Sequence, residues 1–265
     1  MSRKLWILAV VVLSLCLWLP ATESEAKGDW EWTLVPYLWA SDIGMEEKIT
    51  DEPVLETDID FGDLIDKVDL AFTVHFEGRK GRGGFLIDIT AIGLSNETTF
   101  SGGSGSSAPP DGTLVNADID LSIVEVGGFY RPGGEKTGLD ILAGIRYVGM
   151  DQKIDITLPS PPDMPINTKV ESSPTLTDGF IGLRYSGTMG KKWGYAIRGD
   201  IATGGTEQTL NGIIGFSYQI GKSGRYALRL GYRYMTMEIE EVEDGVKIET
   251  DLTMSGIYAG FVFQW

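Results

Sequence analysis

Apolar and polar residues alternate with a period of two along most of the sequence after residue 30. In the segment 225–240, for example, Leu228 and Leu230 share one face, whereas Arg229 and Arg233 share the other. A period of two places successive side chains on opposite faces of a β-strand. The pattern predicts ten strands, near residues 30–43, 67–79, 84–97, 113–131, 138–157, 174–187, 193–203, 206–220, 225–240 and 246–265.

The connections between these segments alternate in length. Tight Gly- and Lys-rich connections such as 80–83 and 221–224 alternate with long Ser-, Pro- or acid-rich ones at 44–67, 101–112 and 159–173. Two connections on the long side, the Gly-Gly pair at 204–205 and the acidic 241–245, are exceptions because they are short. This rhythm is typical of a transmembrane barrel with short turns at one end and longer loops at the other. The sequence therefore predicts an all-β, antiparallel up-and-down transmembrane β-barrel of about ten strands.

A soluble β-sandwich would also alternate, so we compared the two interpretations. A lipid-facing exterior is favoured because one face carries small and charged residues, as a lumen does, while the other ends in aromatic residues. The last strand must then pair with the first, near residues 32–38, because an open sheet edge is too costly in lipid. The fourth strand breaks phase near residues 123–124, which suggests a β-bulge. The expected lipid-interface aromatics are Trp32, Tyr232, Tyr234, Phe261, Phe263 and Trp265.

The first 26 residues have the pattern of an export signal. Arg3 and Lys4 precede an apolar run from residue 5 to residue 19, and small residues end the segment at Ala26. The alternative, a membrane anchor, is disfavoured because 15 apolar residues are short for a span that needs about 20. We therefore expect a cleavable signal over residues 1–26 and a barrel domain over residues 27–265. Cys16, the only cysteine, would leave with the signal.

The net charge limits the classes of partner that the chain can bind. The net charge is −16 at pH 7, which argues against nucleic acid. Outer-membrane lipid and lipopolysaccharide are the expected surroundings, with export and barrel-assembly machinery as partners during biogenesis. We expect a monomer in the outer membrane of a Gram-negative bacterium, without a cofactor.

The segment WEWTLVPYLWASDIG (30–44) resembles the first strand of a widespread, functionally uncharacterised family of Gram-negative outer-membrane β-barrel proteins. The resemblance continues through DFGDLIDKVDLAF (60–72), LRLGYRY (228–234) and DLTMSGIYAGFVF (251–263) and spans almost all of the chain after the signal. It implies the fold and the compartment. It supplies no catalytic residue.

His75 is the only histidine and is the one candidate for acid–base catalysis. The alternation predicts that it faces the lumen, together with Thr73 and Glu77. It could serve as a general base if a nucleophile and an orienting partner lay within hydrogen-bond reach. The favoured alternative is a buried lumen histidine that is bonded to a carboxylate.

Aspartates crowd the predicted first loop and could bind Ca²⁺ through their oxygens. Asp58, Asp60 and Asp63 are the candidate ligands, but their spacing is not that of an EF-hand loop. The same segment fits a short helix at the barrel rim with Asp60 as its N-cap. We favour the helix, and therefore expect no metal site.

Charged residues on the predicted inner faces need partners once they leave water. We expect a lumen network of ion pairs, and a barrel of about ten strands is narrow enough for side chains to fill. A small-solute pore is the alternative. The predicted network consists of Arg146, Arg184, Arg198, Arg229, Arg233, Glu77, Asp88, Asp120, Asp178 and Asp200.

The favoured function is non-enzymatic: a structural or small porin-like protein with a narrow or side-chain-filled lumen. Two alternatives stay open. One is a membrane-embedded hydrolase that acts on lipid A or peptides through His75. The other is an adhesin or binder that uses its surface loops.

Overall fold

The computed structural model describes residues 30–49, 52–59, 72–99, 112–134, 138–158, 166–243 and 246–265. These residues form antiparallel strands and no helix. The strands are β1 (Glu31–Ile49), β2 (Glu52–Ile59), β3 (Phe72–Lys80), β4 (Gly83–Thr99), β5 (Leu114–Tyr130), β6 (Gly138–Leu158), β7 (Ile166–Ser172), β8 (Thr175–Met189), β9 (Trp193–Gly204), β10 (Gln208–Ile220), β11 (Tyr226–Glu243) and β12 (Val246–Gln264).

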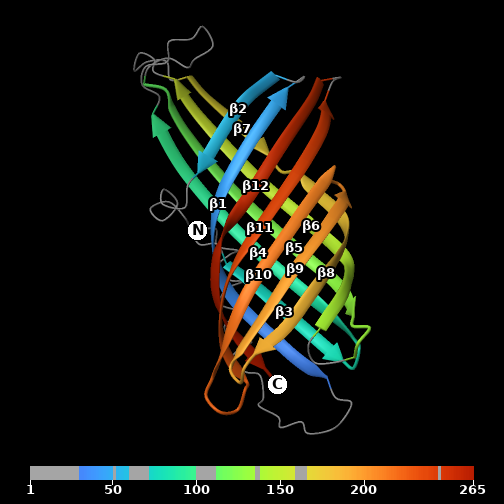
Figure 1. Ribbon diagram of the computed structural model, residues 1–265. Helices are drawn as coiled ribbons and strands as arrows, with labels where there is room; N and C mark the ends of the chain where they lie inside the picture. The colour runs from blue at the N-terminus through green and yellow to red at the C-terminus, as the bar shows by residue number, and fades with distance from the viewer. Residues whose placement is uncertain are drawn as a thin grey trace.

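Ten of the strands close into a barrel, as predicted (Figure 1). Each pairs with its neighbours in chain order, and β12 returns to pair with β1. The closing register joins Thr33 to Gln264 and Leu38 to Ala259. Two further backbone hydrogen bonds join Trp32 and Trp265, with N···O distances of 2.9 and 3.2 Å. The predicted pairing of the last strand with the first is therefore confirmed, and the sheet has no open edge along this seam.

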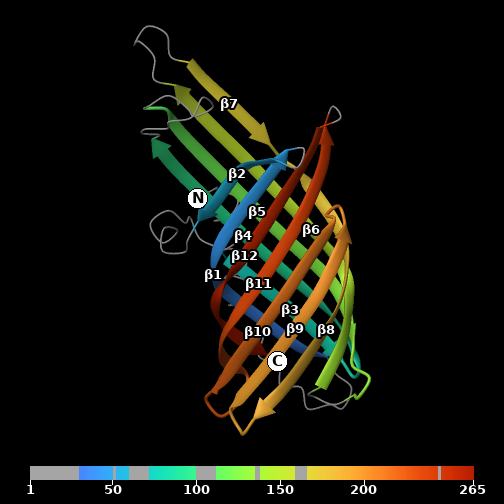
Figure 2. The same cartoon turned by 45° about the horizontal axis from the view of Figure 1, so that its top comes forward.

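The two remaining strands lie where the sequence predicted loops. β1 continues to Ile49, and β2 folds back on it as a hairpin within the expected loop 44–67. β7 likewise lies within the expected loop 159–173 and pairs with the far end of β6. Both hairpins extend the wall beyond the barrel at the same end (Figures 1 and 2). We call this end the loop end, and the opposite end, with the tight turns and residues 31 and 265, the turn end.

The two faces of β5 alternate without interruption. The predicted bulge in β5 is absent, because β5 pairs in continuous register with both β4 and β6. Unbroken alternation places Ile123 and Glu125 in the lumen, where both are buried. Asp120 therefore belongs to the outward face, with Val124 and Val126, and its side chain is exposed. The prediction that Asp120 faces the lumen is wrong because it assumed the phase break.

The outer face of the barrel is a broad apolar surface. Apart from Trp30, which precedes β1, every large exposed apolar side chain among the described residues belongs to the outward set of its strand, from Leu38 on β1 to Phe261 on β12. Such an area far exceeds the few hundred Å² of a typical exposed apolar patch. Aromatic rings gather near the turn end, where Trp193 lies 5.0 Å from Tyr218 and Tyr226 lies 6.0 Å from Phe263 between ring centroids.

Four of the six predicted interface aromatics can be placed by their exposure and contacts. Tyr232 and Tyr234 are each 44% exposed, and Phe261 is 55% exposed, all on the outer face. Trp32 is half-buried and stacks on Phe76 at 5.5 Å. The two others, Phe263 and Trp265, are half-buried at the turn end.

Several predictions fall outside the described residues. They include the signal over 1–26, the rim helix that would start at Asp60, and the candidate ligand Asp63. Asp58 belongs to β2. Within the described ranges, no helix has the length and apolar character needed to cross a membrane.

Candidate functional site in the lumen

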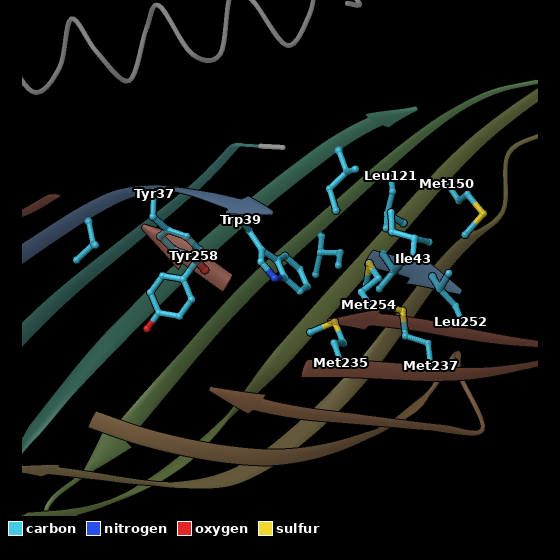
Figure 3. Packing of buried hydrophobic residues seen from close by; sticks show 14 of the residues in the cluster. Tyr37, Trp39, Ile43, Leu121, Met150, Met235, Met237, Leu252, Met254 and Tyr258 are labelled. Atoms are coloured by element: carbon cyan, nitrogen blue, oxygen red, sulfur yellow. The ribbon is translucent and has the colours of Figure 1, made fainter. Parts of the chain in front are cut away.

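Apolar side chains fill the lumen toward the loop end. Trp39 and Ile43 from β1 meet Met235 from β11 and Met254 from β12, and all four are at most 7% exposed (Figure 3). Leu121 and Met150 approach from β5 and β6. We call this cluster the apolar plug; its buried members at this end are Trp39, Ile43, Ile92, Leu121, Ile123, Val148, Met150, Met235, Met237, Leu252 and Met254.

A charged network crosses the lumen next to the plug, with Arg233 at its centre. Arg233 is completely buried and projects from β11. Its guanidinium lies 3.3 Å from Asp88 on β4 and 3.5 Å from Glu125 on β5. It also donates to the Tyr37 hydroxyl at 3.2 Å and to the Asn211 amide oxygen at 3.1 Å. One side chain thus connects five strands across the interior.

Two further arginines complete this network. Arg146 donates from Nε to Glu125 at 3.0 Å and pairs with Asp200 on β9. Arg198 lies 2.8 Å from Glu125 and 2.7 Å from Asp200. Three guanidinium groups therefore surround one buried carboxylate, that of Glu125, and their charges compensate its loss of hydration. We call Arg146, Arg198, Arg233, Asp88, Glu125 and Asp200 the central network.

A second ionic cluster lies closer to the turn end, around Asp140 on β6. Arg131 holds this carboxylate with a two-pronged contact whose longer arm is 2.7 Å, and Arg184 reaches it at 2.9 Å. Arg184 also pairs with Glu77, and Arg79 lies 3.5 Å from Asp140. Planar guanidinium groups match carboxylates in this two-pronged geometry, which fixes direction as well as charge.

Aromatic rings separate the arginine groups. Arg233 lies 4.9 Å from the centre of the Trp39 ring, at the border between network and plug. Arg146 and Arg198 both approach Phe180, at 5.6 and 5.4 Å. These contacts let cations pack against apolar surface at little cost.

The structure brings seven of the ten predicted network residues into ion pairs: Arg146, Arg184, Arg198, Arg233, Glu77, Asp88 and Asp200. Asp178 is buried but bonds elsewhere, since it accepts from the Thr206 amide and hydroxyl at 2.8 Å each. Arg229 faces the lumen and donates from Nε to Ser217 at 3.0 Å. Asp120 is outside, as described above.

Four ionic residues of the lumen were missed: Arg79, Glu125, Arg131 and Asp140. Glu125 was assigned to neither face, because the phase of β5 was uncertain near residues 123–124; it follows Ile123 on the lumen face. Arg131 and Asp140 flank the turn between β5 and β6, where strand ends are hard to assign from sequence. The polar partners Tyr37 and Asn211 give no charge signal, and only the register across the lumen places them beside Arg233.

His75 lies between two carboxylates. Its Nδ1 is 3.3 Å from Asp88, and its Nε2 is 3.5 Å from Glu77. Both ring nitrogens thus face acids rather than a hydroxyl, and among the described residues no serine or threonine is hydrogen-bonded to the ring. General-base catalysis needs one nitrogen directed at a nucleophile or water. The observed arrangement suits an ionic link between the two clusters.

No group of three or more potential metal ligands among His, Cys, Asp and Glu side chains occurs in the described part of the chain. The carboxylate oxygens of Glu77, Asp88, Glu125, Asp140 and Asp200 contact arginine side chains. Of the three candidate calcium ligands, Asp60 and Asp63 lie outside the described residues, and Asp58 is placed only as part of β2.

A cavity of about 760 Å³ occupies the lumen at the turn end. Its inner limit is formed by Tyr37, His75 and Asp88, which belong to or border the central network. Its mouth lies among the tight turns, where Lys192 and Arg225 line it. The lumen is therefore hollow at one end and filled at the other.

No family model matches the chain, and no curated protein does, so the family resemblance noted from the sequence stays a prediction. Among solved structures, the outer membrane protease OmpT from Escherichia coli aligns with 92% of this chain and 99% of its own, at 8% identity and a TM-score of 0.49. The translocator domain of the autotransporter NalP from Neisseria meningitidis covers 99% and 96%, at 10% identity and a TM-score of 0.42.

The toluene transporter TodX from Pseudomonas putida also matches, over 91% of this chain and 90% of its own, at 9% identity and a TM-score of 0.33. At these identities the likeness concerns the barrel fold alone. The chain has the fold of outer-membrane β-barrels, and the differing roles of these three proteins assign none to it.

Proposed function

We propose that this chain is a non-enzymatic outer-membrane barrel whose lumen is closed to passive flow. One observation carries the proposal: around the middle of the lumen, side chains from opposite walls exclude solvent completely. Arg146, Glu125, Arg233 and Met235 are each 0% exposed, and they come from β6, β5 and β11. A water-filled path at this level would leave their lumen-facing atoms accessible.

The proposal includes an orientation. Short connections lie on the periplasmic side in bacterial barrels, so the turn end would face the periplasm and the loop end the exterior. The exposed apolar band would lie in lipid, with lipopolysaccharide around its outer part. Residues 1–26 would direct export, and the chain would act as a monomer.

Single-channel recording in a planar bilayer tests closure. We expect no conductance steps from the wild-type barrel. A matched variant, Trp39→Ala with Arg233→Ala, removes two large neighbouring side chains whose groups lie 4.9 Å apart at the centre of the lumen. This variant should conduct or become noisy. Steady steps from the wild type, at the frequency seen for the double variant, would reject the proposal.

Labelling of intact cells tests the orientation. Asp118→Cys near the loop end should react with a membrane-impermeant maleimide, because this side chain is exposed. Ser223→Cys in a tight turn, equally exposed, should react only after the cells are opened. The reverse labelling pattern would contradict this orientation and place the loop end in the periplasm.

A further inference from the structure

The cavity at the turn end contains a cation that the lumen networks leave uncompensated. Arg229 lines this cavity, and its one hydrogen bond within the described chain runs from Nε to the Ser217 hydroxyl. Every other arginine that projects into the described lumen from the central network or the Asp140 cluster has a carboxylate within 3.5 Å. Arg229 has none there. Its two terminal amino groups therefore remain available to a ligand.

The residues around Arg229 leave room for such a ligand. Arg229 pairs across the sheet with Ser217 on one side and with Gly260 on the other. Gly231 follows it on the same face, and Gly215 lies beneath its side chain, since a methyl group there would lie 3.9 Å from Arg229 Cδ. The small residues on the wall leave room for the Tyr258 ring, which covers Gly215 and Gly231, and the Arg229 side chain extends beside this ring into the cavity.

Further hydrogen-bond donors converge on the same space. The hydroxyl of Tyr258 lies over Gly215, beside the Arg229 stem, and makes no hydrogen bond to a described residue. Ser217 accepts from Arg229 and so keeps its own proton to donate. Guanidinium and hydroxyl donors that no carboxylate contacts form a site for an oxyanion, such as a carboxylate or a phosphate, while Glu77 and Asp88 line the inner part of the same cavity.

The wall between Arg229 and the mouth is apolar on β11 and β12, whereas Gln219 on β10 is polar. The next cross-strand pair toward the turn end is Ala227 with Val262, which are 6% and 3% exposed and line the cavity. Beyond them, Lys192 and Arg225 line the mouth together with Lys191 and the acidic Glu31, so that positive charge is in excess there. A ligand that entered from the turn end would pass a positive rim, then an apolar section, and finally meet Arg229. The positive rim would raise the local concentration of anions, although the whole chain carries a charge of −16.

We propose that the turn-end cavity binds a small organic acid, with its oxyanion head on Arg229, Ser217 and Tyr258 and its apolar body against Ala227 and Val262. The volume of about 760 Å³ lies within the range of small-molecule sites, roughly 300–1,000 Å³. This inference goes beyond the closed-barrel proposal and does not depend on it, because the site is reached from the turn end alone.

Titration calorimetry on the folded barrel in neutral detergent tests the site with three probes. Benzoate carries the head and the body, inorganic phosphate carries a head only, and benzyl alcohol carries a body only. We expect saturable binding of benzoate, binding of phosphate at least about tenfold weaker, and none of benzyl alcohol. Equal binding of phosphate and benzoate would reject the organic-acid part, and absence of heat with both anions would reject the site.

Two variants and a control locate the head group. Arg229→Gln should weaken benzoate binding about tenfold or more, and Arg229→Lys should restore part of it, because lysine keeps the charge without the two-pronged fork. Lys222→Gln changes the net charge equally, but Lys222 does not line the cavity, so it should have no effect. Heat-modifiable gel mobility verifies folding of each variant. Unchanged binding in folded Arg229→Gln, or equal losses in Arg229→Gln and Lys222→Gln, would overturn the assignment.

Discussion

The loop half of the lumen is filled with aliphatic, thioether and indole groups, whereas the middle is filled with arginine and carboxylate groups. Both regions are dry: Met237 and Met254 in the plug are 0% exposed, and so are Glu125 and Arg146 in the network. They differ in what their contacts require. A plug of flexible methionine side chains needs volume, and methionine adapts its shape to gaps. The network needs direction, because each guanidinium must meet a particular carboxylate.

This difference teaches which region specifies the fold. A register shift of one residue in β12 would replace Met254 by Thr253 or Ser255, which would remove apolar contacts at that position without leaving a charge unpaired there. A register shift of one residue would turn Arg233 outward into lipid and leave Asp88 and Glu125 without it. A buried ion network adds little net stability over a well-packed apolar core, yet misplacing one member is costly. We infer that the network fixes the register and the plug completes the filling.

The largest expected effect comes from removing the central charge. Arg233→Met keeps most of the side-chain volume but leaves the buried acids with less compensation, and the free energy of unfolding should fall by about 3–5 kcal/mol. Urea unfolding in lipid vesicles, followed by tryptophan fluorescence, measures it. The control is Lys222→Met in the exposed β10–β11 turn, which should change the value by less than about 0.5 kcal/mol. Equal effects of the two variants would show that the network has no special role.

The plug should respond to volume rather than to chemistry. Met254→Ala creates a cavity and should lower the free energy of unfolding by about 2–3 kcal/mol. Met254→Leu conserves volume, so its cost should stay below about 1.5 kcal/mol. The same unfolding assay compares them. If the leucine variant were as damaged as the alanine variant, the plug would be as specific as the network, and the contrast between the regions would fail.

The alternation of residues was enough to predict most of the wall. It placed β9, β10 and β12 to within a few residues, because these strands have an unbroken period of two between clear turns. It missed β2 and β7, since acidic and Pro-containing segments resemble loops even where a long neighbouring strand provides pairing partners. Pairing across space, not local preference, decides such strands.

The lumen was predictable in kind but not in detail. Arg146, Arg198 and Arg233 were identified because they alternate with lipid-facing residues, and their need for partners follows from burial. Which acid meets which arginine depends on the strand tilt and register, which a single strand does not encode. The hollow turn end was not predictable either, because its lining residues come from strands far apart in the sequence, such as His75 on β3 and Arg229 on β11.

A smaller effect should separate the lumen face from the lipid face. A methyl group at Gly256, on the lumen side of the β1–β12 seam, would overlap the carbonyl oxygen of Ala40. Gly256→Ala should therefore cost about 1–3 kcal/mol through overpacking. Gly199→Ala on the outer face of β9 meets no atom within 4 Å and should be nearly neutral. The unfolding assay in vesicles measures both, and a neutral Gly256→Ala variant would mean that the seam relaxes freely.

The smallest effect should come from an ion pair outside the barrel, which gives the sharpest test of why the buried pairs matter. Lys169 on β7 lies 3.0 Å from Asp155 on β6, closer than Arg233 lies to Asp88 or Glu125, but both side chains are well exposed, at 71% and 45%. The hydrogen bond that Lys169 donates to Asp155 raises the pKa of Lys169, so the charge of this lysine should not change with pH in the neutral range.

Water and salt screen this exposed pair, and holding two long side chains together costs entropy. Lys169→Ala should therefore leave the urea midpoint unchanged within error, both at low salt and at 1 M salt. The contact between Arg233 and Asp88 is longer, at 3.3 Å, but it is buried. Arg233→Met should therefore shift the urea midpoint at both salt concentrations. If Lys169→Ala shifted the midpoint as far, then distance rather than burial would set the strength of these pairs. In that case, the loss of hydration of the buried charges would not explain how the central network fixes the strand register.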